Sequence, residues 1–204
     1  MQKIEYLIGK DENAEYLNIL KRHDTISFIH SKNVAYMAEQ LLPYFKFKED
    51  IQDDVIIEGA LMHDIGKICV PKEILQKKEK LTVSERKIVN QHPLLGGILL
   101  EEKERSYEIK QICLLHHEKL DGSGYPQGLV STFIPDYCRF ITAIDVLDAL
   151  IHSRPYKAAF NKKELYDEIR KMNNGIDFDM YYFYEILKLM ESGKVSIGLD
   201  NLAS

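Results

Sequence analysis

Apolar residues recur at steps of three and four along most of this sequence, and this periodicity constrains the fold more than any other feature. No alternating apolar and polar run reaches the length of a strand, so the sequence predicts an all-α chain. A length of 204 residues suits a single domain with a real core. One of the expected helices reaches Asp64 and ends at Gly66. The repeat predicts helices around residues 34–45, 56–64, 82–89, 93–99, 109–116, 137–148, 161–174 and 178–190.

Capping residues and helix breakers mark several of the boundaries. Thr82 and Glu85 have the spacing of a capping box, and Pro93 suits the first turn of the helix that follows. Glycine and proline interrupt the helical pattern in residues 65–71 and 121–135. We expect loops in both places, and the second is long enough to form the rim of a pocket.

The charge balance excludes several classes of protein. The chain carries 27 Lys and Arg against 32 Asp and Glu, a formal net charge of −5. This balance argues against a polymeric nucleic-acid partner and against a polybasic membrane surface. No apolar run approaches the roughly 20 residues of a membrane span, and the N-terminus lacks the features of a signal peptide. We therefore expect a cytoplasmic protein. Its three cysteines lie far apart, which indicates neither a disulfide framework nor a thiolate zinc site.

Most of the seven histidines fall on helix faces that are otherwise apolar. His30 lies four residues before Val34, for example, and His63 lies three residues after Ala60. A single histidine in such a place is usually a core residue, and a lone buried aspartate usually caps a helix or pairs with a base. The recurrence calls for one explanation, because a buried carboxylate without a partner costs several kcal/mol. The side chains that share this placement are His30, His63, Asp64, His92, His116, His117 and Asp145.

Metal ions would explain the pattern. Imidazole and carboxylate ligands together suit iron, manganese, zinc or nickel, and the cation offsets the charge of Asp64 and Asp145. Neighbouring helical residues point about 100° apart, yet His63 and Asp64 can both flank a metal beside the helix axis. Seven candidate ligands are too many for one ion and suit two ions that share a carboxylate.

Two ordered motifs contain most of these residues. Residues 63–67 read HDIGK, and residues 116–126 read HHEKLDGSGYP. They resemble the HD-x-GK and HHE-xx-DG-x-GYP signatures of the HD-GYP phosphodiesterases, which belong to the HD phosphohydrolase superfamily. The resemblance extends from about Arg22 to Met190, nearly the whole chain.

This resemblance implies a fold, an activity and a cofactor. The fold would be an HD-type helical bundle of one domain with a GYP loop. The activity would be hydrolysis of cyclic di-GMP to pGpG, and in some members on to GMP, by attack of a metal-activated hydroxide on phosphorus. Two divalent ions would serve, iron or manganese first and zinc or nickel as alternatives. Carried over by position, the metal ligands are His30, His63, Asp64, His92, His116, His117 and Asp145.

The resemblance also assigns catalytic and substrate-binding residues. Asp64 matches the carboxylate that bridges the metals, and Lys67 matches a lysine that contacts a substrate phosphate. These two are the implied catalytic residues. Tyr125 lies on the GYP loop near the substrate, and Arg154 matches a basic residue that meets phosphate or guanine.

Some positions depart from the family pattern or fall outside it. Ile26 stands where some members have a glutamate that binds a third metal, so we expect a centre of two metals. Asp148 stands where some members have a lysine that contacts phosphate, which leaves the substrate contacts open. Glu118 is either a partner of a ligating imidazole or a solvated surface charge. His23 and His152 lie outside the matched ligand set and are expected to be ordinary side chains.

The expected organisation is a helical extension over residues 1–21, the HD-GYP catalytic domain over 22–190 and a tail over 191–204. The extension is too short for the receiver or sensory domain that most members carry. Regulation would therefore come from a partner signalling protein, a homodimer contact, the redox state of the metal or expression. Two alternatives to the enzyme stay open at this point: an inactive receptor or scaffold for the cyclic dinucleotide, and an HD-type di-iron oxygenase.

Overall fold

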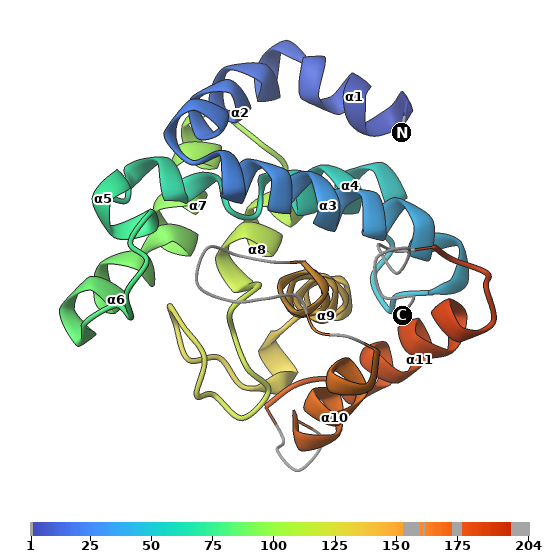
Figure 1. Ribbon diagram of the computed structural model, residues 1–204. Coiled ribbons are helices and arrows are strands. Elements are labelled where there is room, and N and C mark those ends of the chain that lie inside the picture. The colour runs from blue at the N-terminus through green and yellow to red at the C-terminus, as the bar shows by residue number, and fades with distance from the viewer. Residues whose placement is uncertain (1, 153–159, 161, 173–176, 197–204) are drawn as a thin grey trace.

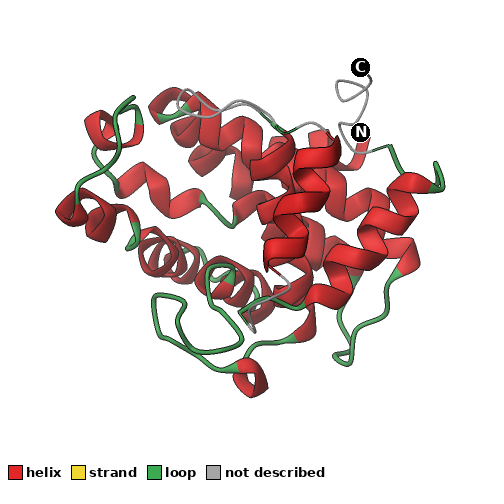
Figure 2. Ribbon diagram, turned by 60° about the horizontal axis from the view of Figure 1, so that its bottom comes forward, coloured by secondary structure: helices red, strands yellow, loops and turns green. Residues whose placement is uncertain are grey.

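The computed structural model describes residues 2–152, 160, 162–172 and 177–196 of the chain (Figure 1). The regular secondary structure of these residues is helical (Figure 2). Asp121 and Val130 form an isolated β-bridge. The prediction of an all-α fold is therefore confirmed. The α-helices are α1 (Gln2–Gly9), α2 (Asp11–His23), α3 (Thr25–Leu41), α4 (Asp53–Met62), α5 (Lys72–Leu75), α6 (Val83–Val89), α7 (His92–Glu102), α8 (Tyr107–Leu115), α9 (Asp136–Ile151), α10 (Lys162–Met172) and α11 (Met180–Glu191). The 3₁₀ helices are η1 (Leu42–Tyr44), η2 (Ile65–Cys69) and η3 (Ser131–Phe133).

Helix α9 forms the middle of the molecule, with α3, α8 and α11 packed against it (Figure 1). Its side chains Phe140, Ile141 and Ile144 are completely buried. Beyond it, α3 packs on α4, α4 on α8, and α8 on α7, which continues the core across the molecule. Asp145 and Asp148 lie on this same buried helix, so both carboxylates need partners inside the core.

Local sequence signals set several helix ends as expected. The capping box of Thr82 and Glu85 is formed at the start of α6, and Pro93 occupies the first turn of α7. The last predicted helix begins at Met180 rather than at residue 178, because the side chain of Asp179 caps it by accepting from the backbone N–H of Tyr181. Residues 161 and 173–176, where the preceding helix is predicted to begin and end, lie outside the described part of the chain.

The helix predicted over 56–64 begins and ends earlier than expected, as α4. It ends at Met62, and the histidine and aspartate that follow lie in the turn before η2. The prediction that Gly66 ends this helix is wrong, and so is the prediction of an irregular loop directly after it, because η2 occupies that place. Packing explains the glycine: a Cβ on Gly66 would lie 1.9 Å from the carbonyl oxygen of His92. Only glycine lets η2 approach the start of α7 this closely.

The first two helices pack on the rest of the bundle. α2 contacts α3 and η2, and the buried side chain of Asn13 donates a hydrogen bond of 2.9 Å to Glu58 on α4. The division of the chain into residues 1–21, 22–190 and 191–204 stays a prediction. No helix within the described residues is long and apolar enough to cross a membrane.

Candidate metal centre

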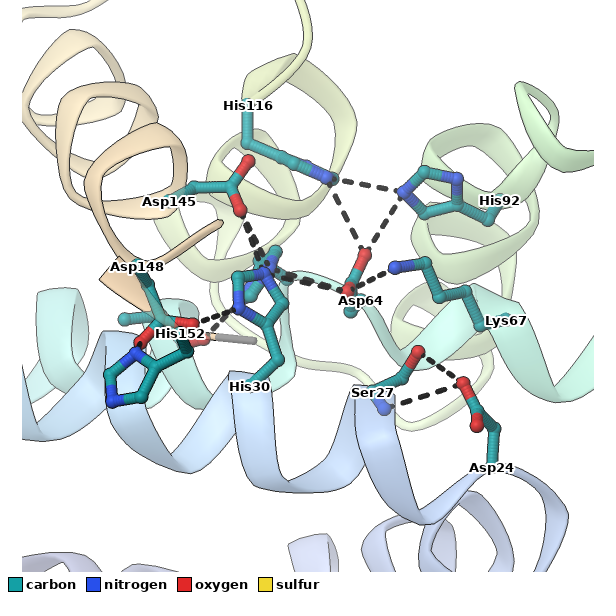
Figure 3. A network of polar contacts seen from close by, with 12 residues as sticks. Asp24, Ser27, His30, Asp64, Lys67, His92, His116, Asp145, Asp148 and His152 are labelled. Carbon is teal, nitrogen blue, oxygen red and sulfur yellow. Dashed lines mark hydrogen bonds and ion pairs between the residues drawn. The ribbon is translucent and has the colours of Figure 1, made fainter. Parts of the chain in front are cut away.

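The structure brings all seven predicted metal ligands together inside the bundle. Figure 3 labels His30, Asp64, His92, His116 and Asp145 among them. The seven ligands form two groups, and within each group the possible ligand atoms lie within 4.8 Å of one another. Six of the seven side chains are buried, and His117 is partly buried. The first group is Asp64, His92, His116 and His117, and the second is His30, His63 and Asp145.

Helix ends supply most of these side chains. His63 and Asp64 follow the end of α4, His92 is the first residue of α7, and His116 comes directly after α8. The two exceptions lie within helices, since His30 belongs to α3 and Asp145 to α9. A residue at a helix end can be aimed along the axis as well as sideways, which lets several elements point at one centre.

Three of the histidines are oriented by the same local device. Nδ1 of His63 lies 2.7 Å from the carbonyl oxygen of Ala60, three residues earlier in the chain. His92 and His116 repeat this contact, each at 2.8 Å and again with the carbonyl three residues earlier. A carbonyl can only accept, so Nδ1 carries the proton and donates it. The lone pair of Nε2 is then free in each ring to bind a metal.

The fourth oriented histidine uses a carboxylate in place of a carbonyl. Nδ1 of His30 lies 2.6 Å from Oδ2 of Asp148, and Nε2 lies 2.7 Å from Oδ1 of Asp145. Asp148 is 2% exposed, and its Oδ1 atom lies 2.8 Å from Nδ1 of His152. Asp148 thus joins His30 to His152. His152 lies outside both ligand groups, but its ion pair with Asp148 was not expected from the sequence. His23 lies apart and contacts the carbonyl of Val70.

Asp64 lies between the two groups, with one carboxylate oxygen facing each of them (Figure 3). Oδ1 is 3.1 Å from Nε2 of His92 and 3.8 Å from Nε2 of His116. Oδ2 is 3.5 Å from Nε2 of His63 and 3.9 Å from Nε2 of His30. This is the arrangement that a carboxylate shared between two cations requires.

Lys67 reaches the same carboxylate from η2. Its Nζ atom lies 2.5 Å from Oδ2 of Asp64, and the side chain lines the cleft above the centre. This ion pair together with the nearby imidazoles outweighs the effect of burial and holds the pKa of Asp64 well below its usual range. Asp64 is therefore a carboxylate anion, the form that binds metal.

Burial and nearby charges shift the pKa values of the histidines in different directions. Burial lowers the pKa of His63, of His116 and of His117, the last to about 3, so these rings are neutral. Burial also opposes protonation of His30, but its contacts with Asp145 and Asp148 raise its pKa to about 9. A proton and a metal ion would compete for Nε2 of His30.

The loop that follows His116 and His117 covers one side of the centre. Its expected irregular conformation over 121–135 is confirmed apart from η3. The ring of Tyr125 lies 4.7 Å from the ring of His117, centroid to centroid. The loop folds back so closely that a Cβ on Gly124 would lie 2.4 Å from the backbone nitrogen of Lys119. This position has no room for a side chain.

Glu118 holds this loop in place. It is 3% exposed, and its two carboxylate oxygens accept hydrogen bonds from the backbone N–H groups of Gln127 at 2.7 Å and Leu129 at 2.9 Å. Both earlier interpretations of Glu118 are therefore wrong, since it is neither a partner of an imidazole nor a solvated charge.

Replacing Glu118 by glutamine is expected to loosen the loop. An amide offers one acceptor where the carboxylate offers two, and the loss of a charge-assisted bond costs about 2 kcal/mol. Urea denaturation should show a stability decrease of that size, and trypsin should cleave at Lys119 sooner than in the parent protein. Glu79→Gln, on the rim of the cleft, is the matched control. Unchanged stability and cleavage in the Glu118 variant would contradict this role.

A cleft of about 790 Å³ opens above the two groups. Residues of both ligand groups line the cleft, which is large enough for a small organic ligand. Of the predicted substrate-binding residues, Lys67 and Tyr125 line it, whereas Arg154 lies outside the described residues. Ile26, the residue expected to exclude a third metal, lies on its wall together with Asp24.

Comparison with known proteins identifies the family. A profile of the HD domain matches residues 16–181. The chain belongs to the HD domain family. This confirms the family that the two sequence motifs indicated.

Curated relatives of this HD domain protein are named as cyclic dinucleotide phosphodiesterases. A cyclic di-GMP phosphodiesterase of Pseudomonas aeruginosa is 32% identical over 191 residues, which cover 89% of this chain and 46% of the relative. A 3'3'-cGAMP-specific phosphodiesterase of Vibrio cholerae is 33% identical over 153 residues, which cover 75% of this chain and 35% of the relative. The chain thus spans less than half the length of these relatives.

A solved structure has the same fold. An HDG"Y"P protein from Bdellovibrio bacteriovorus superimposes with a TM-score of 0.67 at 16% identity, over 93% of this chain and 68% of that one. The HD-type helical bundle is therefore confirmed.

Proposed function

We propose that this HD domain protein is a metal-dependent phosphodiesterase that hydrolyses cyclic di-GMP to pGpG, with GMP as the product of a second cleavage. The observation that carries the proposal is the pair of ligand groups on either side of Asp64, below a cleft that also contains Lys67. The names of the curated relatives support hydrolysis over the receptor and oxygenase alternatives.

The residues of the centre fit divalent cations. Nε2 of His63 is buried without a hydrogen-bond partner among the described residues, and Nε2 of His92 lies 3.2 Å from Nε2 of His116. Such convergent nitrogen lone pairs are unfavourable unless a cation lies between them. Imidazole and carboxylate ligands suit iron or manganese, with zinc or nickel as alternatives, and we propose two ions per chain.

We assign each ion to one group of ligands. Asp64, His92, His116 and His117 would hold one ion, and His30, His63 and Asp145 the other, with Asp64 shared between them. Bound there, the two cations would supply a nucleophilic water and neutralise the charge of a phosphate. The side chain of Ile26 offers no ligand for a third ion.

The protein side chains complete the chemistry. Lys67 is placed to stabilise the negative charge that develops on the phosphate, because its ammonium group is beside the shared carboxylate and faces the cleft. Tyr125, held against His117, forms part of the wall on which the substrate rests. Burial raises the pKa of the Tyr125 phenol, which keeps it protonated and able to donate a hydrogen bond. Arg154 stays a proposed contact to phosphate or guanine.

Metal analysis with a nucleotide panel tests this proposal. Protein purified without oxygen should contain close to two metal ions per chain and should cleave cyclic di-GMP. Cyclic GMP-AMP belongs in the panel because one relative is named for it, and cyclic di-AMP and pGpG complete the set. A reproducible content of three metals would contradict the argument from Ile26. Binding of cyclic di-GMP by metal-loaded protein without turnover would support the receptor instead.

Asp148 should affect the metal through His30 alone. Asp148→Ala removes the acceptor that fixes Nδ1 of this ring, and loss of such a partner typically lowers metal affinity about 10- to 100-fold. Asp148→Asn keeps one acceptor oxygen and should lose less. A chelator competition should show that one ion is released more easily while the other is retained. Equal release of both ions in the alanine variant would contradict this role.

We also propose that the protein is cytoplasmic. The described residues contain three free cysteines, which suits the reducing cytoplasm. A homodimer contact or a partner signalling protein is proposed as the source of regulation.

A further inference from the structure

One wall of the cleft carries three cations that the proposed chemistry does not use. Lys78 and Lys80 lie in the segment between α5 and α6, and Arg86 lies on α6 itself. All three line the cleft and are exposed to solvent. In Figure 1 this segment stands at the left edge of the molecule. The cleft that it lines also reaches Tyr125.

These three cations differ from the other lysines of the cleft. Lys67 is paired with Asp64, Lys77 lies 2.8 Å from both carboxylate oxygens of Glu85, and Lys119 lies 2.9 Å from Asp177. No carboxylate of the described residues pairs with the three cations, although Glu79 lies on the same wall. Positive side chains that line a cleft without internal partners attract an anionic ligand.

The described residues of α9 that line another wall of the cleft carry no positive charge. The residues of α9 that line the cleft are Thr142, Asp145, Val146, Ala149 and Leu150, and none of them is a cation. Their mostly apolar surface suits a nucleobase. Arg86, in contrast, lines the cleft together with Tyr125. Burial raises the pKa of the Tyr125 phenol, and the charge of Arg86 acts in the opposite direction.

The proposed substrate has an anion for this wall. A cyclic dinucleotide contains two phosphodiester groups on opposite sides of one ring, and only one of them can lie at the metal centre during cleavage. We infer that Lys78, Lys80 and Arg86 form a second anion subsite that binds the phosphate that is not being hydrolysed. This inference rests on the proposed function. The subsite would select cyclic dinucleotides over diesters with a single phosphate.

The double variant Lys80→Gln/Arg86→Gln tests the inference. We expect KM for cyclic di-GMP to rise about tenfold or more, because two charge-assisted contacts to phosphate are lost, while kcat and metal content stay unchanged. KM for bis(p-nitrophenyl) phosphate, a diester with one phosphate, should not change. The salt dependence of KM for cyclic di-GMP should also become weaker. A structural defect would alter both substrates alike.

The matched control is Lys48→Gln/Lys87→Gln, which removes two exposed positive charges that do not line the cleft. It should leave both KM values near those of the parent. A parent-like KM for cyclic di-GMP in the Lys80/Arg86 variant, with the parent active, would overturn the subsite alone. If the parent cleaves no nucleotide, the proposed function fails. Calorimetric binding of cyclic di-GMP then still decides, since the subsite requires weaker binding only in the Lys80/Arg86 variant.

Discussion

Replacement of Asp64 by asparagine is expected to remove metal from both groups of ligands at once and to lower hydrolysis by at least about 10³-fold. Each carboxylate oxygen of Asp64 faces a different group, at 3.1 Å from His92 on one side and 3.5 Å from His63 on the other. An amide has the same size but no negative charge, and its nitrogen repels a cation. Elemental analysis after desalting, together with the rate of cyclic di-GMP cleavage, would measure the effect.

Asp24→Asn is the control for this variant. Asp24 also lines the cleft and is buried, but it caps α3 by accepting hydrogen bonds from the backbone and side chain of Ser27. This control should keep both metals and most of the activity. An Asp64→Asn protein that keeps a full complement of metal would show that Asp64 is not shared, and one that keeps a single ion would assign Asp64 to one group.

Lys67→Gln should have the second largest effect and should separate metal binding from catalysis. The variant keeps every proposed ligand, so its metal content should match that of the parent protein. It loses the ammonium group that faces the cleft, and removal of one such electrostatic contact typically costs about 10²- to 10³-fold in kcat. Steady-state kinetics with cyclic di-GMP would measure the loss.

Two further variants sharpen this experiment. Lys67→Arg keeps a positive charge and should recover part of kcat, whereas Lys77→Gln removes a cleft lysine whose charge is already paired with Glu85. The latter should leave kcat near that of the parent. A Lys67→Gln enzyme with an unchanged kcat would remove Lys67 from the mechanism, and one without metal would show that Lys67 acts by holding Asp64 in place.

The sequence predicted the helices better than it predicted their ends. Periodicity and capping depend on neighbouring residues, so the start of α6 at Thr82 was within reach of local reasoning. The close approach of Gly66 to the carbonyl of His92, just after the end of α4, was not, because these two residues are far apart in the chain. Local patterns carry no information about such a contact.

Contacts between distant residues also limited the prediction of the candidate site. The inward histidines and aspartates could be found because each continues the apolar spacing of a helix that it belongs to or adjoins, and the structure brings them together. Asp148 was missed as a partner of His30 because 118 residues separate the two. A local signal did exist, since Asp145, Asp148 and His152 follow one another at helical spacing. The role of Glu118 depends on a loop that folds back on it, and no local pattern reveals this.

The contacts between imidazole Nδ1 and a carbonyl three residues earlier have a consequence for local unfolding. The carbonyls of Ala60, Val89 and Cys113 belong to the last turns of α4, α6 and α8, where helices normally fray. A histidine whose Nε2 is bound to a metal would keep its Nδ1 hydrogen bond to the carbonyl three residues earlier. This hydrogen bond would suppress the fraying. Loss of metal should therefore be registered at three separate helix ends as faster amide hydrogen exchange, while the interior of α9 exchanges as slowly as before.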